Sequence, residues 1–268
     1  MSRTFDVKRQ GAFTTIAITG FILLYLPILV LGVYSFNASE SLSIWAGFSW
    51  KWYATAWANV RVQDATFRSL QLAAIASVIS TTVAVLAALA TTRGTPWRGQ
   101  NLMSAMINQP LMVPEIVTAV ALLVFFAMIK QATGYTGMGY LILAHTAFCI
   151  PFAYLPIRAR LQGMDLSLEQ AAADLYAPPA KVFFHVTLPL LYPGVLSGAM
   201  LAFVISLDDV IITEFLKSAG QDTLPTYMLG QIRRIITPEI NAIATALLAL
   251  SVLMVLAVFF LSRKPTEE

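Results

Sequence analysis

Six long hydrophobic runs separated by short polar segments dominate the pattern of this chain. They cover residues 12–34, 69–91, 102–129, 138–157, 192–216 and 240–261. A membrane-spanning helix needs about 20 mostly apolar residues, and open structures other than helices leave their backbone unsatisfied in lipid. The pattern therefore predicts an all-α membrane protein with six transmembrane helices. We expect residues 1–268 to form a single transmembrane domain.

The composition agrees with a membrane protein. Charged residues make up 12% of the chain, whereas a soluble domain carries about 25%. So few charges cannot cover a soluble surface of this length. The net charge of +3 gives no indication of nucleic-acid binding, and the single Cys149 excludes a disulfide within the chain.

The distribution of Lys and Arg predicts how the chain is oriented. Six spans place both termini on the same side of the membrane. That side holds ten of the seventeen basic residues, and cytoplasmic segments carry an excess of Lys and Arg, so both termini are predicted to be cytoplasmic. The ten residues are Arg3, Lys8, Arg9, Arg93, Arg98, Arg158, Arg160, Lys181, Arg263 and Lys264.

A polar interruption, "SLEQAAADLYAPPAKVFFHVTLP" at residues 167–189, separates the fourth and fifth runs. Ser167 and Gln170 fit the capping-box pattern of a helix start, and Pro178 ends the helix that follows. An apolar stripe consists of Leu168, Ala171, Ala172 and Leu175, and the opposite face of Glu169, Gln170, Ala173 and Asp174. The spacing fits two structures equally: a helix that docks into a partner's groove, and a loop helix that packs on the chain's own spans.

No catalytic motif accompanies these spans. The dipeptide Gly-Lys is absent, so the chain lacks the common phosphate-binding loop. It also contains no HExxH, no GxSxG and no Cys/His cluster, and His145 and His185 are interpreted as packing or surface residues. We therefore expect neither an enzyme nor a metal site, and no cofactor bound by this chain.

Four carboxylates lie within the predicted spans: Glu115, Asp208, Asp209 and Glu214. An ionised side chain at the membrane centre costs roughly 2.5–3.5 kcal/mol on insertion scales, so these groups should not face lipid. Two interpretations remain open: structural pairs, for instance with Arg233 or Lys217, and a negative path that attracts a cationic solute.

Local geometry refines the expectations for these carboxylates. Neighbours on a helix point about 100° apart, so one of Asp208 and Asp209 should face a neighbouring helix or cation. Pro110 and Pro114 precede Glu115, and each removes a hydrogen bond from its helix. The third run is therefore expected to kink or to break beside Glu115.

The interruption resembles the EAA loop of ABC importer permeases, whose pattern is E-A-A, three residues, G, nine residues and I-x-L-P. Ala171, Ala172, Leu188 and Pro189 match this pattern at the same spacing. Gln170 replaces the acid, with Glu169 one place earlier, Tyr176 replaces the glycine, and Val186 replaces the isoleucine.

Other segments resemble the spermidine/putrescine importer permeases. They include "YSFNAS" at residues 34–39, "PLMVPEIVTAVALL" at 110–123 and "AFVISLDDVIITEF" at 202–215. The resemblance implies the arrangement of an ABC type I importer permease, with a cytoplasmic coupling helix between spans 4 and 5 in the loop 166–189. The residues it implies for coupling to an ATPase are Glu169, Gln170, Ala171, Ala172, Asp174, Leu175, Tyr176, Leu188 and Pro189.

The same resemblance implies partners, a location and a substrate. The partners are two cytoplasmic ATPase subunits that bind ATP and Mg²⁺, a second and related permease chain, and a periplasmic or extracellular solute-binding protein. The location is the bacterial inner membrane, in contact with lipid. The implied substrate is a polyamine such as putrescine or spermidine, and the carboxylates would line its path. The alternatives are an ABC importer permease for another small organic solute and an ion-coupled secondary transporter.

Overall fold

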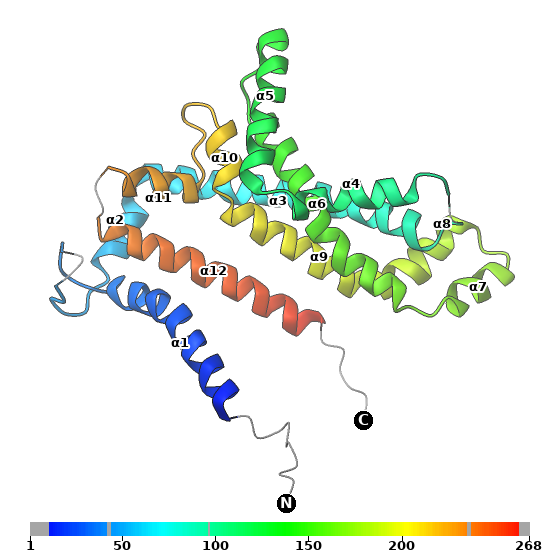
Figure 1. Ribbon diagram of the computed structural model, residues 1–268, viewed down its shortest axis with the longest axis horizontal. Coiled ribbons are helices and arrows are strands. Elements are labelled where there is room, and N and C mark those ends of the chain that lie inside the picture. Colours follow the sequence, from blue (N-terminus) through cyan, green and yellow to red (C-terminus); the bar gives the residue numbers. More distant parts are fainter. Residues whose placement is uncertain (1–10, 42–43, 96, 235–236, 263–268) are drawn as a thin grey trace, which may run out of the picture. The chain divides into compact units, whose positions relative to one another are not determined.

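The computed structural model describes residues 11–41, 44–95, 97–234 and 237–262, and these are largely helical (Figure 1). Five of the basic residues on which the predicted orientation depends lie outside the described residues: Arg3, Lys8, Arg9, Arg263 and Lys264. The helices are α1 (Gly11–Tyr34), α2 (Lys51–Ala58), α3 (Val60–Thr92), α4 (Gln100–Met112), α5 (Glu115–Thr133), α6 (Gly139–Gln162), α7 (Ser167–Asp174), α8 (Pro179–Val182), the π-helical turn η1 (Phe183–Thr187), α9 (Leu188–Asp208), α10 (Ile211–Leu216), α11 (Leu224–Ile232) and α12 (Glu239–Ser262).

Six helical segments in the described part of the chain are long and apolar enough to cross a membrane, as the sequence predicts. Two of the predicted runs differ from single helices. The run 102–129 is divided between α4 and α5, and the run 192–216 between α9 and α10. In addition, α3 extends over 33 residues and begins at Val60, well before the predicted start at residue 69.

The break between α4 and α5 follows from Pro114. A proline pushes the residue before it out of helical geometry, and Val113 accordingly has an extended ψ of 135°. Pro114 is itself extended, and its carbonyl accepts the amide of Val117 at 2.9 Å, so that a new helix begins at Glu115. Pro110, in contrast, lies inside α4 without breaking it.

The chain divides into two compact units, which we describe separately. The first comprises residues 1–60 and 231–249. Asn37 holds the connection between α1 and α2. Its side-chain amide donates to the carbonyl of Ile44 at 2.7 Å, and its backbone carbonyl accepts the indole N–H of Trp52 at 2.8 Å. Trp52 is buried, whereas Trp50 and Trp57 are exposed. Some aromatic side chains of this segment therefore pack inside the unit, and others lie on its surface.

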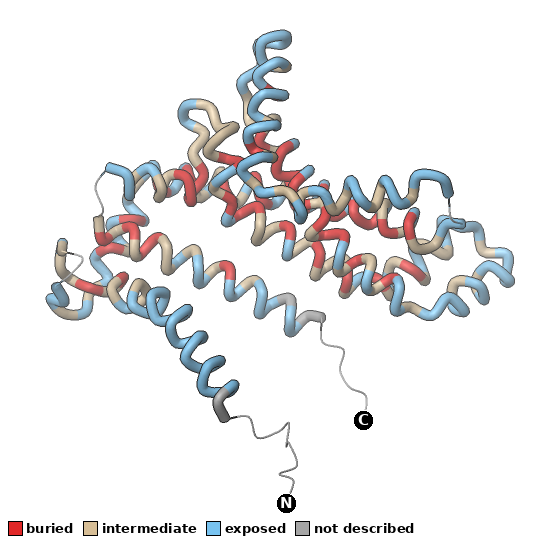
Figure 2. The backbone as a smooth tube through the Cα atoms, in the orientation of Figure 1, coloured by how far each residue is buried: buried red, intermediate tan, exposed pale blue. Residues whose placement is uncertain are grey.

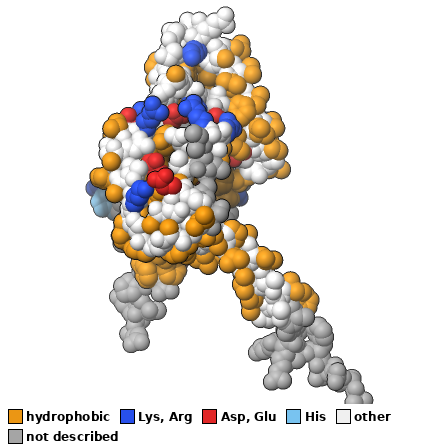
Figure 3. Space-filling model, turned by 90° about the vertical axis from the view of Figure 1, so that its left-hand side faces the viewer, with side chains coloured by type: hydrophobic (Ala, Val, Ile, Leu, Met, Phe, Trp, Pro, Cys, Tyr) orange, Lys and Arg blue, Asp and Glu red, His pale blue; other side chains and the backbone are white. Residues whose placement is uncertain are grey.

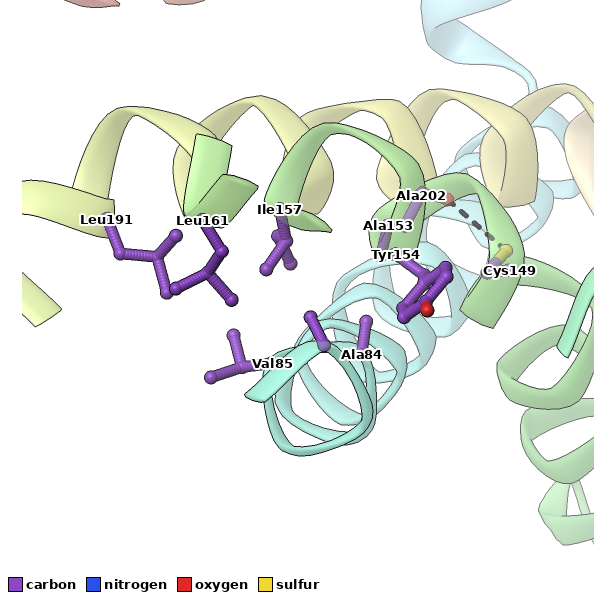
Figure 4. Packing of buried hydrophobic residues seen from close by; sticks show 10 residues of the cluster. Ala84, Val85, Cys149, Ala153, Tyr154, Ile157, Leu161, Leu191 and Ala202 are labelled. Atoms are coloured by element: carbon purple, nitrogen blue, oxygen red, sulfur yellow. Dashed lines mark hydrogen bonds between the residues drawn. The ribbon is translucent and has the colours of Figure 1, made fainter. Parts of the chain in front are cut away.

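The second unit comprises residues 61–230 and 250–268, and its core lies where α3, α6 and α9 pack together. Figure 2 shows buried positions along these three helices. Small side chains of α3 face larger ones of α6, and Figure 4 shows Ala84 and Val85 opposite Tyr154 and Leu161. Close helix contact through small residues is typical of membrane bundles.

Charged side chains are sparse on the surface. On the face shown in Figure 3, the Lys, Arg, Asp and Glu side chains form small groups among hydrophobic side chains. None of the described side chains of α1 is buried, and Phe21, Leu24 and Leu29 each keep more than half of their surface accessible. Such a surface suits contact with lipid or with other membrane helices.

Two glycines allow α9 to approach α6 closely. A Cβ atom placed on Gly198 would lie 2.7 Å from the carbonyl oxygen of Ala153, and one on Gly194 would lie 2.7 Å from the Cβ of Arg160. The contact at Gly198 is with backbone, which cannot move without displacing α6. The GxxxG spacing in this span therefore serves the packing of α9 on α6.

This packing predicts that Gly198→Ala lowers stability by about 1–3 kcal/mol, the usual cost of overpacking. Gly32→Ala in α1 is the matched control, since a Cβ there has no heavy atom within 4 Å. We expect a lower midpoint of thermal unfolding in detergent for Gly198→Ala and an unchanged or higher one for Gly32→Ala. Equal midpoints for the two variants would contradict close packing at Gly198.

Candidate functional site

The loop 166–189 contains a short helix whose start differs from the predicted capping box. Ser167 is the first helical residue of α7, and the N-cap position is Leu166, which makes no side-chain capping hydrogen bond. The cap comes instead from Asp165, whose Oδ1 accepts the amide of Ser167 at 2.9 Å. This backbone hydrogen bond lowers the pKa of the exposed Asp165 carboxyl below its ordinary value, so the cap is fully ionised at neutral pH.

The turn at the end of α7 shows why the EAA-loop pattern has glycine at the position of Tyr176. The amide of Ala177 donates to the carbonyl of Ala172, and the amide of Tyr176 donates to the carbonyl of Ala173. These are the two bonds of a Schellman motif, which needs a left-handed residue at the position of Tyr176. Tyr176 has φ +60°, the only positive φ of a non-glycine residue in the described part of the chain. The turn is therefore kept in spite of the substitution.

Glu169 holds the loop 166–189 against the rest of its own unit. Its carboxylate forms an ion pair with Arg93 at 3.0 Å, beyond the end of α3, and accepts the hydroxyl of Thr187 in η1 at 3.1 Å. The Glu169 and Arg93 side chains are only 15% and 16% exposed. Loss of one partner from a largely buried pair leaves an uncompensated charge, so Glu169 fixes the position of α7 from inside the chain.

The opposite face of α7 is exposed. Leu168, Ala171 and Leu175 lie at the surface, and Tyr176 is 96% accessible. Gln170 and Asp174 are exposed as well, whereas Ala172 is half-buried. Most of the predicted apolar stripe therefore faces away from the chain itself.

The loop ends at a local widening of the helix before Pro189. Proline has no amide hydrogen and its ring clashes with the carbonyl four residues earlier. In η1, the π-helical turn immediately before it, the amide of Leu188 donates to the carbonyl of Phe183. A single π-helical turn of this kind is a usual response to such a disturbance. Leu188 and Pro189 therefore shape the start of α9.

Glu214 belongs to a cluster of charges at the end of α10. The ammonium of Lys217 lies 2.6 Å from Glu214 and 2.7 Å from Asp222. Burial lowers the pKa of Lys217, but its hydrogen bonds to Asp222 and Glu214 raise it more, so the pKa lies above its ordinary value. Lys217 therefore stays charged at physiological pH. Glu214 is thus paired with Lys217, in agreement with one of the two interpretations that the sequence leaves open.

Asp208 and Asp209 face different surroundings, as their spacing predicts. Asp208 is the last residue of α9 and is exposed. Asp209 is extended, with ψ 131°, and its carboxylate is buried at the start of α10. There it accepts the amides of Ile212 at 3.3 Å and Thr213 at 2.9 Å. The break in this span is thus stabilised by a side chain that caps the second helix.

His145 completes this buried polar cluster, although the sequence indicates no role for it. Its Nδ1 lies 2.8 Å from the hydroxyl of Ser206, and its Nε2 lies 2.9 Å from that of Thr213 and 3.3 Å from Asp209. The partners are more than sixty residues away in the chain, so no local motif signals the contact. The only sequence signal is a polar residue inside an apolar run.

Glu115 brings the two helix breaks together. It is the first residue of α5, beside the break at Pro114, and its half-buried side chain lies next to that of Asp209. Of the four predicted path residues, three gather at the breaks: Glu115, Asp208 and Asp209. Discontinuous membrane helices of this kind commonly form solute and ion sites in transporters. Among the described residues, no three His, Cys, Asp or Glu side chains gather so as to hold a metal ion.

Comparison with solved structures shows the fold of ABC importers. A bacterial ABC transporter involved in the import of the acidic polysaccharide alginate matches with a TM-score of 0.68 at 14% identity, covering 99% of both chains. The MetNI methionine ABC transporter matches with a TM-score of 0.62 at 18% identity, covering 78% of this chain and 97% of that one. The predicted arrangement of an ABC type I importer permease is confirmed.

Sequence comparison identifies the family. The putrescine transport system permease protein PotI of Escherichia coli K12 is 38% identical over 98% of this chain and 95% of the relative. The spermidine/putrescine transport system permease protein PotC of Haemophilus influenzae is 36% identical over 90% and 92%. A family model described as "Binding-protein-dependent transport system inner membrane component" matches residues 80–264. The chain therefore belongs to this family of inner membrane transport components.

Proposed function

We propose that the chain is the permease subunit of an ATP-driven importer and forms the path for a polyamine such as putrescine or spermidine. The 38% identity to a putrescine permease over 98% of the chain carries this proposal. Membership of a family that depends on a binding protein favours an importer over an ion-coupled secondary transporter. The test is ATP-dependent uptake of labelled putrescine and spermidine by proteoliposomes that contain the assembled transporter.

The proposed assembly contains two ATPase subunits, a second and related permease chain and an external solute-binding protein. ATP and Mg²⁺ are bound by the ATPase subunits. Both termini lie in the cytoplasm, and with six spans the loop 166–189 lies on the same side. The exposed stripe of Leu168, Ala171 and Leu175 supports docking of α7 on an ATPase subunit, because a helix that packed on its own spans would bury this stripe.

The same geometry divides the coupling residues into two groups. Ala171, Leu175 and Tyr176 are available to a partner, whereas Glu169 contacts Arg93 and Thr187 of its own chain. Glu169 therefore acts on coupling by holding α7 in place. Ala172 is half-buried and contributes less surface to a partner than Ala171 does.

The docking proposal predicts that Ala171→Arg abolishes co-purification of the ATPase subunit. A long cation cannot enter a close-packed groove without losing its water, while the membrane spans remain unaffected. Ala132→Arg, at an exposed position in the last turn of α5, is the matched control and should leave the complex intact. Normal recovery of the ATPase with Ala171→Arg would mean that this face of α7 does not dock on the ATPase.

Tyr176 allows the turn and the side chain to be tested separately. Tyr176→Gly keeps the left-handed turn, because glycine adopts positive φ readily, and removes the exposed ring. If the ring contacts the ATPase, this variant should assemble with a weaker affinity for the ATPase while the purified permease keeps its thermal midpoint. Tyr176→Val, whose branched side chain disfavours positive φ, should in contrast disturb the loop itself. Equal ATPase affinity for parent and Tyr176→Gly would assign the position to the turn alone.

Fewer carboxylates are available to the solute than the four that the sequence predicts along its path. Asp208 is exposed and is the best candidate to meet a cationic solute, with the half-buried Glu115 second. Asp209 and Glu214 have partners within the chain, and we assign them to support of the path. A polyamine carries several positive charges and therefore needs ionised carboxylates along its route.

Asp208→Asn should therefore weaken uptake at low polyamine concentration while assembly and basal ATPase activity stay intact. The substitution keeps the shape and removes an attraction of about 1 kcal/mol in water and about 4 kcal/mol at an effective dielectric of 20. We expect the KM for uptake to rise about fivefold or more. Asp64→Asn, an exposed carboxylate of α3, is the control and should behave like the parent. An unchanged KM for both Asp208→Asn and Glu115→Gln would exclude the acidic path.

A further inference from the structure

The buried His145 bridges the two sides of the break between α9 and α10. Its side chain is 1% exposed. Ser206, on its Nδ1 side, lies before the break, and Thr213, on its Nε2 side, lies after it. The ring thus fixes the distance between the end of one helix and the start of the next, from a position on a third helix, α6.

The hydrogen bonds around the ring form a consistent chain. The Thr213 hydroxyl donates to Asp209 at 2.8 Å, which leaves its oxygen to accept from the Nε2–H of His145. Nδ1 can then accept the hydroxyl proton of Ser206. In this arrangement every polar atom of the ring has a partner, as buried polar groups require. An apolar side chain in place of His145 would leave Ser206, Thr213 and Asp209 with fewer partners.

The bridge through His145 affects which of two adjacent carboxylates, Asp208 or Asp209, is exposed. Asp209 is 7% exposed and is held by His145 and by the first turn of α10, whereas the neighbouring Asp208 is exposed. Because Asp209 is an extended residue between the two helices, its burial depends on how the ends of α9 and α10 are held. We propose that His145 is a positioning residue for transport: by holding both sides of the break, it withdraws Asp209 and presents Asp208 to the solute.

This inference rests on the proposed role of Asp208 in the path, and the first test uses that role. Uptake of putrescine by the assembled transporter is measured against concentration for His145→Leu, Asp208→Asn and the double variant. His145→Leu should raise KM about tenfold, equivalent to about 1.4 kcal/mol, and Asp208→Asn should add little to it. His145→Gln keeps a donor toward Thr213 and Asp209, and it should restore part of the loss. Ser206→Ala, a smaller change, should raise KM in the same direction.

Tyr154→Phe is the matched control on the same helix. Tyr154 is also fully buried, and its hydroxyl pairs with Thr91 at 2.9 Å. Loss of this bond should lower stability and leave KM unchanged. The proposal is overturned if His145→Leu lowers only the yield or the maximal rate, or if Asp208→Asn keeps its full effect in the His145→Leu background.

A second measurement does not depend on the identity of the solute. Cys149 is the only cysteine of the chain, so Cys149→Ala provides a background for Asp208→Cys. A membrane-impermeant cationic thiol reagent should modify the introduced thiol rapidly, and several-fold more slowly when His145→Leu is added. An unchanged rate would overturn the positioning role. A slower rate in a transporter that does not carry putrescine would keep the positioning role and exclude only the proposed substrate.

Discussion

The need to satisfy backbone hydrogen bonds away from water governs the centre of this structure. A break inside a membrane helix exposes amides and carbonyls that lipid cannot satisfy. At the break after α9, the carboxylate of Asp209 supplies acceptors for the amides of Ile212 and Thr213. At the break before α5, the carbonyl of Pro114 accepts the amide of Val117. The hydrogen bonds at the two breaks differ. The breaks nevertheless lie close together, because Glu115 at the break before α5 lies next to Asp209 at the break after α9.

The tight packing of α6 against α9 makes this arrangement possible. Gly194 and Gly198 remove side-chain volume where the two helices approach. His145 on α6 can then reach Ser206 on α9 and Thr213 on α10. A bulkier contact would increase the separation of the helices, and a hydrogen bond of about 3 Å loses its geometry with a small displacement. Small residues and a buried polar cluster are therefore two parts of one interface.

The sequence predicts the spans and the short helix of the loop 166–189 well because both depend on local patterns. Apolar run length identifies six membrane helices, and a proline marks the break beside Glu115. The roles of individual polar side chains depend on contacts between distant residues. His145 gave no local signal because its partners lie on other helices, and periodicity requires Asp208 and Asp209 to differ without deciding which one is buried. The resemblance implies a coupling role for Glu169, but no local pattern signals its contact with Arg93, more than seventy residues away in the chain.

Continuous helix joins the loop 166–189 to the break between α9 and α10. From Pro179 through η1 and α9 to Asp208 the chain is helical over 30 residues, a length of about 45 Å at 1.5 Å per residue. Thr187 near its start contacts Glu169 of the loop, and Ser206 near its end contacts His145. Because a packed helix transmits displacement along its axis better than a flexible connection does, the proposed docking of α7 implies that a movement imposed there reaches the break through α9.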